Sequence, residues 1–220
     1  MLWLRKILDG ISLLLAPPYC SACRAWMLER VPLCVDCDGQ ILPIVAHALP
    51  ITPALLLPVF AIADYQAPLR QLILAKHRSD RLSARQLGEL IWQKTAVSQL
   101  EFDIIVPIPL HWTRRMRRGY NQAQEIATVL GAFSNKPVLT LLQRNKRTAF
   151  QSLLSRVQRA QNVKDVFICA TAHSASLYRN KRILIVDDLM TSGATLQAAV
   201  KPLLKLEPAA LYAAVACRVV

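Results

Sequence analysis

Short runs of apolar residues alternate along the chain with segments in which apolar residues recur at helical spacing. The apolar runs at 102–109, 183–186 and 210–218 predict strands that are buried on both faces of a sheet. Apolar residues three or four positions apart predict helices over 122–130 and 194–206. Strands that alternate with helices favour parallel pairing with right-handed crossovers. The pattern therefore predicts an α/β fold, with a parallel sheet flanked by helices.

Further elements are predicted outside this core, and they divide the chain into two parts. In chain order they are an amphipathic helix over 1–16, a strand over 55–65, a helix from Pro68, a helix over 82–97, and strands over 137–142 and 166–170. The stretch 41–58 contains four prolines and is interpreted as a linker. We expect an N-terminal module over 1–45 and a main domain over 46–220, in which 55–98 supplies lid elements and 102–220 the core. No apolar run is long enough to predict a transmembrane helix.

Four cysteines form two close pairs near the N-terminus. Cys20 and Cys23 are followed, after ten residues, by Cys34 and Cys37. Two thiolate pairs joined by a short loop suit a tetrahedral Zn²⁺, and four cysteine ligands leave no open position for catalysis. Two disulfides or four free thiols are the alternatives, and disulfides are disfavoured because no convincing export signal precedes the pairs. The spacing thus predicts a structural zinc knuckle.

The net charge of +13 is concentrated in one segment of the chain. Residues 104–164 contain eleven lysines and arginines and a single carboxylate, Glu125. Such a segment favours a polyanionic partner, although a solvated basic face is the simpler interpretation when the charge stands alone. Aromatic residues on which bases could stack are interleaved with these cations: Trp112, Tyr120 and Phe150.

The residues after the strand at 183–186 are the strongest candidates for ligand binding. Two carboxylates follow the strand directly, and a turn of small residues then leads into a helix. The backbone N–H groups and hydroxyls of such a turn suit a phosphate, since a helix N-terminus adds partial positive charge. The carboxylates suit ribose hydroxyls, or a Mg²⁺ held beside a pyrophosphate. The candidate residues are Asp187, Asp188, Thr191, Ser192, Gly193, Ala194 and Thr195.

Arginines follow the strand at 102–109 and form a second candidate site. Guanidinium groups match pyrophosphate or DNA phosphate oxygens through paired hydrogen bonds. The candidate residues are Arg114, Arg115, Arg117, Arg118, Arg144 and Arg159. The long polar stretch 143–164 is interpreted as a flap that closes on ligand. His111 is interpreted as a loop histidine rather than a proton donor, and no catalytic residue is assigned.

The segment from Ile183 to Thr195 resembles the phosphoribosyl-pyrophosphate (PRPP) loop of type I phosphoribosyltransferases. Three other features occur with it: the cysteine pairs, the Arg-Gly-Tyr-Asn-Gln run of 118–122 after Pro107-Ile108-Pro109, and a Gln-x-x-Leu then Arg-x-x-Asn-Val pattern over 151–163. Together they resemble the ComF family of competence-associated, phosphoribosyltransferase-like proteins. The family usually has Phe where this chain has Tyr120.

The resemblance implies a type I phosphoribosyltransferase fold and a role in natural transformation. PRPP or a nucleotide would meet Asp187 and Asp188 through its ribose hydroxyls and the turn 191–195 through its 5′-phosphate, and Mg²⁺ would arrive with the ligand. The resemblance also implies a cytoplasmic location, the handling of incoming single-stranded DNA, and contact with the DNA-uptake machinery at the inner membrane.

Two classes of function remain open at this stage. Handling of single-stranded DNA is favoured, because the basic segment adjoins the phosphate site and no segment identifies a hood that would recognise an acceptor base. An active phosphoribosyltransferase in nucleotide metabolism is the alternative. A combination is also considered, in which a nucleotide at the Asp187 loop regulates DNA binding.

Overall fold

The computed structural model describes residues 18–29, 31–42, 44, 46–75, 81–110, 119–144, 166–170 and 176–219, and the account below concerns these residues. Their helices and strands, in chain order, are α2 (Val35–Gly39), β1 (His47–Thr52), β2 (Leu55–Asp64), α3 (Leu69–Ala75), α4 (Arg81–Lys94), the 3₁₀ helix η2 (Ala96–Gln99), β3 (Ile104–Pro107), α6 (Gln122–Ser134), β4 (Leu142–Arg144), β5 (Phe167–Cys169), β6 (Arg182–Val186), β7 (Leu189–Met190), α8 (Ala194–Leu204) and β8 (Ala210–Arg218).

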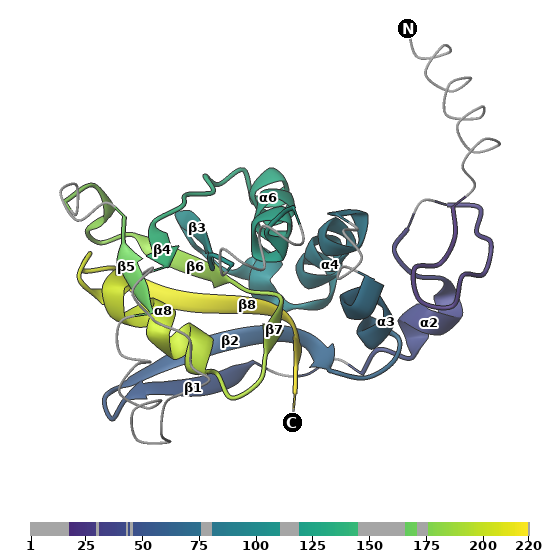
Figure 1. Cartoon of the computed structure of the whole chain (residues 1–220), viewed down its shortest axis with the longest axis horizontal. Coiled ribbons are helices and arrows are strands. Elements are labelled where there is room, and N and C mark those ends of the chain that lie inside the picture. Colours follow the sequence, from purple (N-terminus) through teal and green to yellow (C-terminus); the bar gives the residue numbers. More distant parts are fainter. Residues whose placement is uncertain are drawn as a thin grey trace, which may run out of the picture.

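The main sheet is mostly parallel (Figure 1). Its strand order is β1-β2-β8-β6-β3, and the short β7 pairs with the end of β8. The pairs β2–β8, β6–β8 and β3–β6 are parallel, whereas β1 joins β2 as an antiparallel edge strand. The predicted α/β fold with a parallel sheet is therefore confirmed.

Alternate residues of β6, an inner strand of the sheet, enter two different hydrophobic cores. Ile183 and Ile185 lie in the core that contains α8, whereas Leu184 and Val186 lie in the core that contains α4 and α6. All four side chains are fully buried. The helices cover both faces of the sheet (Figure 1), which explains why the strand is an unbroken apolar run instead of an alternating one.

The sequence indicated a linker over the proline-containing stretch 41–58, and this prediction is wrong. His47–Thr52 forms β1, and a tight connection leads into β2. Pro50 is compatible with this assignment because an edge strand needs no hydrogen bonds on its open side. β2 lies inside the sheet between β1 and β8, so the expectation that 55–98 acts as a lid is wrong for this strand.

The strands expected at 137–142 and 166–170 do not belong to the main sheet. Val138 makes only an isolated bridge to Ile105 of β3. β4 and β5 pair with each other as a separate antiparallel sheet, whose side chains Leu142 and Phe167 enter the core that contains α8. The apolar patterns correctly indicated burial, but they did not specify the partner strand.

The cysteine module, defined here as residues 18–42, packs against α4. Cys20 and Cys37 share one hydrophobic core with Leu87 and Ile91 of that helix. The Ser21 hydroxyl donates a 2.7 Å hydrogen bond to Gln86 Oε1, and Lys94 Nζ lies 2.6 Å from Asp38 Oδ2. The division into 1–45 and 46–220 remains a prediction, and the helix expected over 1–16 lies outside the described residues.

Within the described part of the chain, no helix combines the length and the apolar character needed to cross a membrane.

Candidate functional site

The two predicted carboxylates lie at the carboxyl end of β6, next to the central strand β8. The Asp187 N–H donates to the Ala214 carbonyl at 3.0 Å, and the Ala216 N–H donates to the Asp188 carbonyl at 3.3 Å. The Asp188 N–H also donates to Asp187 Oδ1 at 2.8 Å. Both residues are half-buried. The backbone of this acidic pair is thus held by the sheet, and both residues remain partly exposed.

Gly193 fixes the turn between the carboxylates and α8. It serves as the N-cap of α8 with a φ of +75°, a conformation that favours glycine. A Cβ at this position would lie 2.5 Å from Cδ1 of Leu49, a buried side chain of β1. The first turn of α8 is also tied to β1, because Gln197 Nε2 donates to the Pro50 carbonyl at 2.8 Å. The edge strand β1, which the sequence analysis did not predict, therefore forms one wall of the candidate phosphate-binding site.

The turn itself is open to a ligand. Thr191, Ser192, Ala194 and Thr195 are exposed, whereas Gly193 is buried against β1. The N-cap residue contributes no side-chain acceptor to the first turn of α8. Backbone amides at the start of this helix, together with the nearby hydroxyls, make a suitable binding site for an anion.

The segment 119–122 reaches the same edge of the sheet. The Ile108 N–H donates to the Val186 carbonyl at 2.9 Å, and Asn121 Nδ2 donates to the Ile108 carbonyl at 3.0 Å. These two bonds connect the start of α6 to the residue directly before Asp187. The structure thus places Asn121, which follows the predicted arginine segment, close to the acidic pair. The predicted residues Arg114, Arg115, Arg117, Arg118 and Arg159 lie outside the described residues, as do His111, Trp112 and Phe150.

Gln122, the first residue of α6, ends the Arg-Gly-Tyr-Asn-Gln run, but the sequence analysis assigned it no role of its own. Its side chain is 1% exposed, and among the described residues neither its amide nitrogen nor its amide oxygen has a hydrogen-bond partner. A buried amide without partners is costly and calls for an explanation. Helical spacing in the sequence could have indicated that Gln122 is buried. It lies four residues before Ile126 and eight before Leu130, so it shares the inward face of the predicted helix with them.

Arg144 is described, but it lies in the separate β4–β5 sheet. Its guanidinium carbon is 5.6 Å from the centre of the Phe167 ring, an arrangement typical of a cation–π contact. Its predicted role in binding pyrophosphate or DNA stays a prediction.

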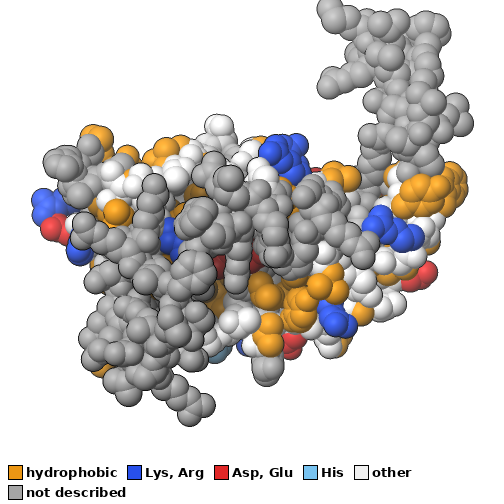
Figure 2. Space-filling model, viewed as in Figure 1, with side chains coloured by type: hydrophobic (Ala, Val, Ile, Leu, Met, Phe, Trp, Pro, Cys, Tyr) orange, Lys and Arg blue, Asp and Glu red, His pale blue; other side chains and the backbone are white. Residues whose placement is uncertain are grey.

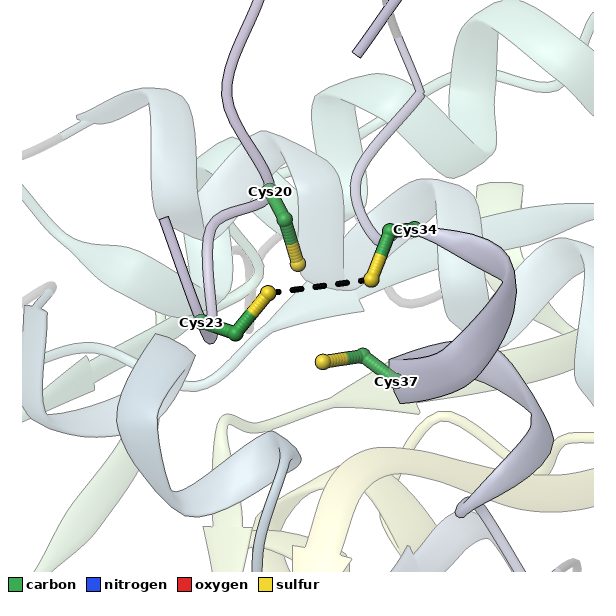
Figure 3. A group of neighbouring side chains, drawn as sticks. All are labelled: Cys20, Cys23, Cys34 and Cys37. Carbon is green, nitrogen blue, oxygen red and sulfur yellow. Dashed lines mark hydrogen bonds between the residues drawn. The ribbon is translucent and has the colours of Figure 1, made fainter. Parts of the chain in front are cut away.

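The four cysteine sulfurs converge on one point (Figure 3). All four Sγ atoms lie within 4.8 Å of one another, and those of Cys23 and Cys34 are 3.7 Å apart. The second distance is too long for a disulfide, which needs about 2.05 Å. It matches the edge of a tetrahedron of thiolates around Zn²⁺, about 3.8 Å for Zn–S bonds of about 2.3 Å. The cluster can therefore hold a metal ion such as zinc.

The local environment prepares one thiol of this cluster for ligation. Burial opposes ionisation of Cys20, but backbone N–H donors of Cys23, Cys34 and Ala22 lower the pKa of its thiol to about 6. Burial, and then the neighbouring thiol of Cys34, raise the pKa of Cys37 well above its usual range. A bound metal ion would offset the cost of ionising these thiols, because it holds coordinating thiols in their deprotonated form.

Comparison with known proteins gives a consistent picture. Residues 79–219 match the model of the phosphoribosyl transferase domain family. The chain is 37% identical to Competence protein F of Haemophilus influenzae over 129 residues, which is 58% of this chain and 56%, little more than half, of that protein. It is 29% identical to the DNA utilization protein YhgH of Salmonella typhimurium over 90% of this chain and 89% of that protein.

A further relative is also named as a competence protein. Competence protein ComFC of Bacillus subtilis is 32% identical over 49% of this chain and 40% of its own length. The matched family model covers the sheet from β3 onward, the acidic pair and the turn before α8. The chain therefore belongs to the phosphoribosyl transferase domain family, as a phosphoribosyltransferase-like protein of the ComF group.

Proposed function

We propose that this protein binds PRPP or a related nucleotide at the 187–195 turn and handles single-stranded DNA during natural transformation. Relatives named as competence and DNA utilization proteins support the competence role. The binding of PRPP or a nucleotide is supported by one observation. An acidic pair, held by the sheet at the end of β6, is followed by an exposed turn at the start of α8. In this proposal the protein works in the cytoplasm, in contact with the DNA-uptake machinery at the inner membrane.

Each part of the proposed ligand has a chemical counterpart in the site. The amides and hydroxyls of 191–195 receive the 5′-phosphate, and the carboxylates of Asp187 and Asp188 accept hydrogen bonds from the ribose hydroxyls. Carboxylate oxygens also suit Mg²⁺, which would neutralise part of the charge of a pyrophosphate. The bond from the Asp188 N–H to Asp187 Oδ1 orients the first carboxylate, so that its other oxygen can face the ligand.

The DNA half of the proposal depends on charge. The chain has 27 lysines and arginines against 14 carboxylates, and the excess is concentrated in 104–164. Cations that contact phosphates release counterions from the strand, so binding of this kind weakens steeply as salt rises. In this proposal the basic segment adjoins the sugar-phosphate site, so that binding of one ligand can influence binding of the other.

Catalysis of phosphoribosyl transfer is the second candidate function, and membership of the phosphoribosyl transferase domain family favours it. In that reaction a nucleophilic nitrogen forms a bond to the anomeric carbon of PRPP as the bond to pyrophosphate breaks. The protein would align the two reactants and stabilise the charge on the leaving group. Pyrophosphate release from PRPP in the presence of Mg²⁺ and a panel of bases measures this directly.

One titration series tests the proposed function. Fluorescence anisotropy of a labelled oligothymidylate is measured across a range of salt concentrations, with and without PRPP and Mg²⁺. We expect the affinity for DNA to fall steeply as the salt concentration rises. Alanine at Arg114, Arg115, Arg117 and Arg118 should make the slope of log affinity against log salt concentration shallower, by about 0.7 for each lost phosphate contact. The matched control replaces four exposed cations elsewhere, namely Arg70, Lys181, Lys201 and Lys205.

The ligand arm uses isothermal titration calorimetry with PRPP and Mg²⁺. Asp187→Asn should weaken PRPP binding, whereas Glu29→Gln, which changes an exposed carboxylate of the cysteine module, should not. Binding of PRPP without any change in DNA affinity would remove the regulatory link. Salt-independent DNA binding, or equal losses in the two sets of four cation replacements, would contradict the DNA half.

A further inference from the structure

Two large aromatic side chains are held side by side on the outer surface of the cysteine module. Tyr19 and Trp26 form an isolated antiparallel bridge. On either side of it, the Met27 N–H donates to the Pro18 carbonyl and the Cys20 N–H donates to the Ala25 carbonyl, both at 2.9 Å. The two aromatics are therefore a non-hydrogen-bonded pair, whose side chains share one face with Cβ atoms about 4.5–5.5 Å apart.

This pair is exposed, although its neighbours are buried. Tyr19 is 50% exposed and Trp26 is 61% exposed, whereas Cys20 and Met27, which follow each of them in the chain, enter the core shared with α4. Figure 2 shows hydrophobic side chains at the end of the molecule that carries the module. The hairpin thus buries the side chains of Cys20 and Met27 on one face and exposes the rings of Tyr19 and Trp26 on the other.

We infer that Tyr19 and Trp26 form a base-stacking platform for single-stranded DNA, an inference that rests on the proposed function. Adjacent aromatic side chains on a rigid scaffold accept the faces of successive bases without regard to sequence. The turn between the two rings carries an exposed arginine, Arg24, whose backbone N–H is fixed by the Cys20 carbonyl at 2.9 Å. Its guanidinium can meet a strand phosphate while the bases lie on the rings.

The charge of the rest of the chain, and not that of the module, favours DNA over a protein partner at this platform. The chain as a whole carries +13, which attracts a polyanion to any part of its surface. The module itself is not basic: residues 18–42 contain two arginines and three carboxylates, a net charge of −1, although Asp38 is paired with Lys94 of α4. The platform should therefore contribute stacking and leave the salt dependence to the basic segment.

Exposed aliphatic residues on the same module provide the contrast. Leu28 is 75% exposed and Val35 is 89% exposed. A protein partner would bury these branched side chains as well as the rings, whereas stacked bases need only the aromatic faces. The two kinds of partner should therefore differ in whether they depend on Leu28 and Val35.

The test compares two probes that carry the same phosphates: a labelled oligothymidylate and an abasic strand of equal length. With the full-length, zinc-loaded protein, we expect Tyr19→Ala/Trp26→Ala to weaken binding of oligothymidylate about tenfold or more for each ring that stacks. Binding of the abasic strand and the slope of affinity against salt should not change. Tyr19→Phe/Trp26→Phe should retain most of the affinity, and Leu28→Ala/Val35→Ala is the matched control. Circular dichroism and bound zinc are measured for every variant, so that unfolded proteins are set aside.

The result separates this inference from the proposed function. If the unmodified protein binds oligothymidylate through its arginines but the Tyr19→Ala/Trp26→Ala variant binds equally well, the platform is overturned and the proposed function stands. Equal losses on both probes, or losses in the Leu28→Ala/Val35→Ala variant instead, also overturn it in favour of a structural role or a protein-docking surface. An unmodified protein that binds neither probe overturns both proposals.

Discussion

At the scale of single residues, the turn before α8 depends on a glycine and the leucine that packs against it. Gly193 has a φ of +75°, and a Cβ there would lie 2.5 Å from Leu49 Cδ1. Because Leu49 is only 5% exposed, its side chain has little room to move away. The backbone of the turn therefore approaches β1 more closely than any other residue type allows.

We expect Gly193→Ala to destabilise the protein by more than the conformational penalty alone. The positive φ costs an L-residue about 1–2 kcal/mol, and displacement of Leu49 adds to this. Gly119→Ala is the matched control, since Gly119 has a φ of +76° but no atom of the described residues within 4 Å of the added Cβ. Urea unfolding of both variants measures the difference, which should shrink when each is made in a Leu49→Ala background. Equal losses for the two glycines would mean that the contact with Leu49 is unimportant.

At the scale of secondary-structure elements, an ion pair joins the beginnings of β3 and β6. Asp103 Oδ2 accepts from the Arg182 N–H at 2.8 Å, and Asp103 Oδ1 accepts from Arg182 Nη2 at 3.1 Å. The Asp103 N–H in turn donates to the Arg182 carbonyl at 2.8 Å. Hydrogen bonds from the side chain and backbone of Arg182 lower the pKa of Asp103 to about 2.

This pair should make stability depend on pH in the acidic range. The pKa of Asp103 is lower in the folded protein than the ordinary value of about 3.9, so its contribution is complete above about pH 4 and is lost as the pH falls toward 2. Asp103→Asn should reduce the free energy of unfolding by about 1 kcal/mol at pH 7, and by much less at pH 2. Urea unfolding at both values measures this. Glu101→Gln is the control, because Glu101 pairs with the same arginine but is 84% exposed and should contribute little.

The elements of the core were predictable because their signals are local. The apolar run 183–186 and the apolar residues after Gly193 correctly indicated β6 and α8, and 210–218 coincides with β8. The partners of the outer strands were not predictable in the same way. The stretch 137–142 has strand-like composition, but only contacts with residues far along the chain decide that 142–144 pairs with β5 rather than with the main sheet.

At the scale of the whole molecule, a chain of side-chain contacts connects the cysteine module to the acidic pair through α4 and α6. Ser21 and Asp38 bind α4, as described above, and Arg85 Nε of that helix lies 2.9 Å from Glu125 Oε2 of α6. The Arg81 guanidinium lies over the ring of Tyr120, at 5.7 Å from its centre. From Asn121 the connection continues to Ile108 and Val186. The cysteine spacing predicted the cluster, but side-chain contacts between distant segments leave no periodic signal in the sequence, so this docking could not be predicted.

The shared core leads to a prediction about metal removal. Because Cys20 and Cys37 are packed in the same cluster as Leu87 and Ile91, loss of the metal should weaken α4 as well as the module. We expect a strong chelator to lower the midpoint of thermal unfolding of the full chain in a single transition, and replacement with Co²⁺ to give the absorption bands of a tetrahedral thiolate site. Cys23→Ser should reproduce the effect of chelation, whereas Cys169→Ser, in β5, should not lower metal content. An unchanged main transition in the metal-free protein would instead show that residues 46–220 fold independently of the module, as a strict division into two domains requires.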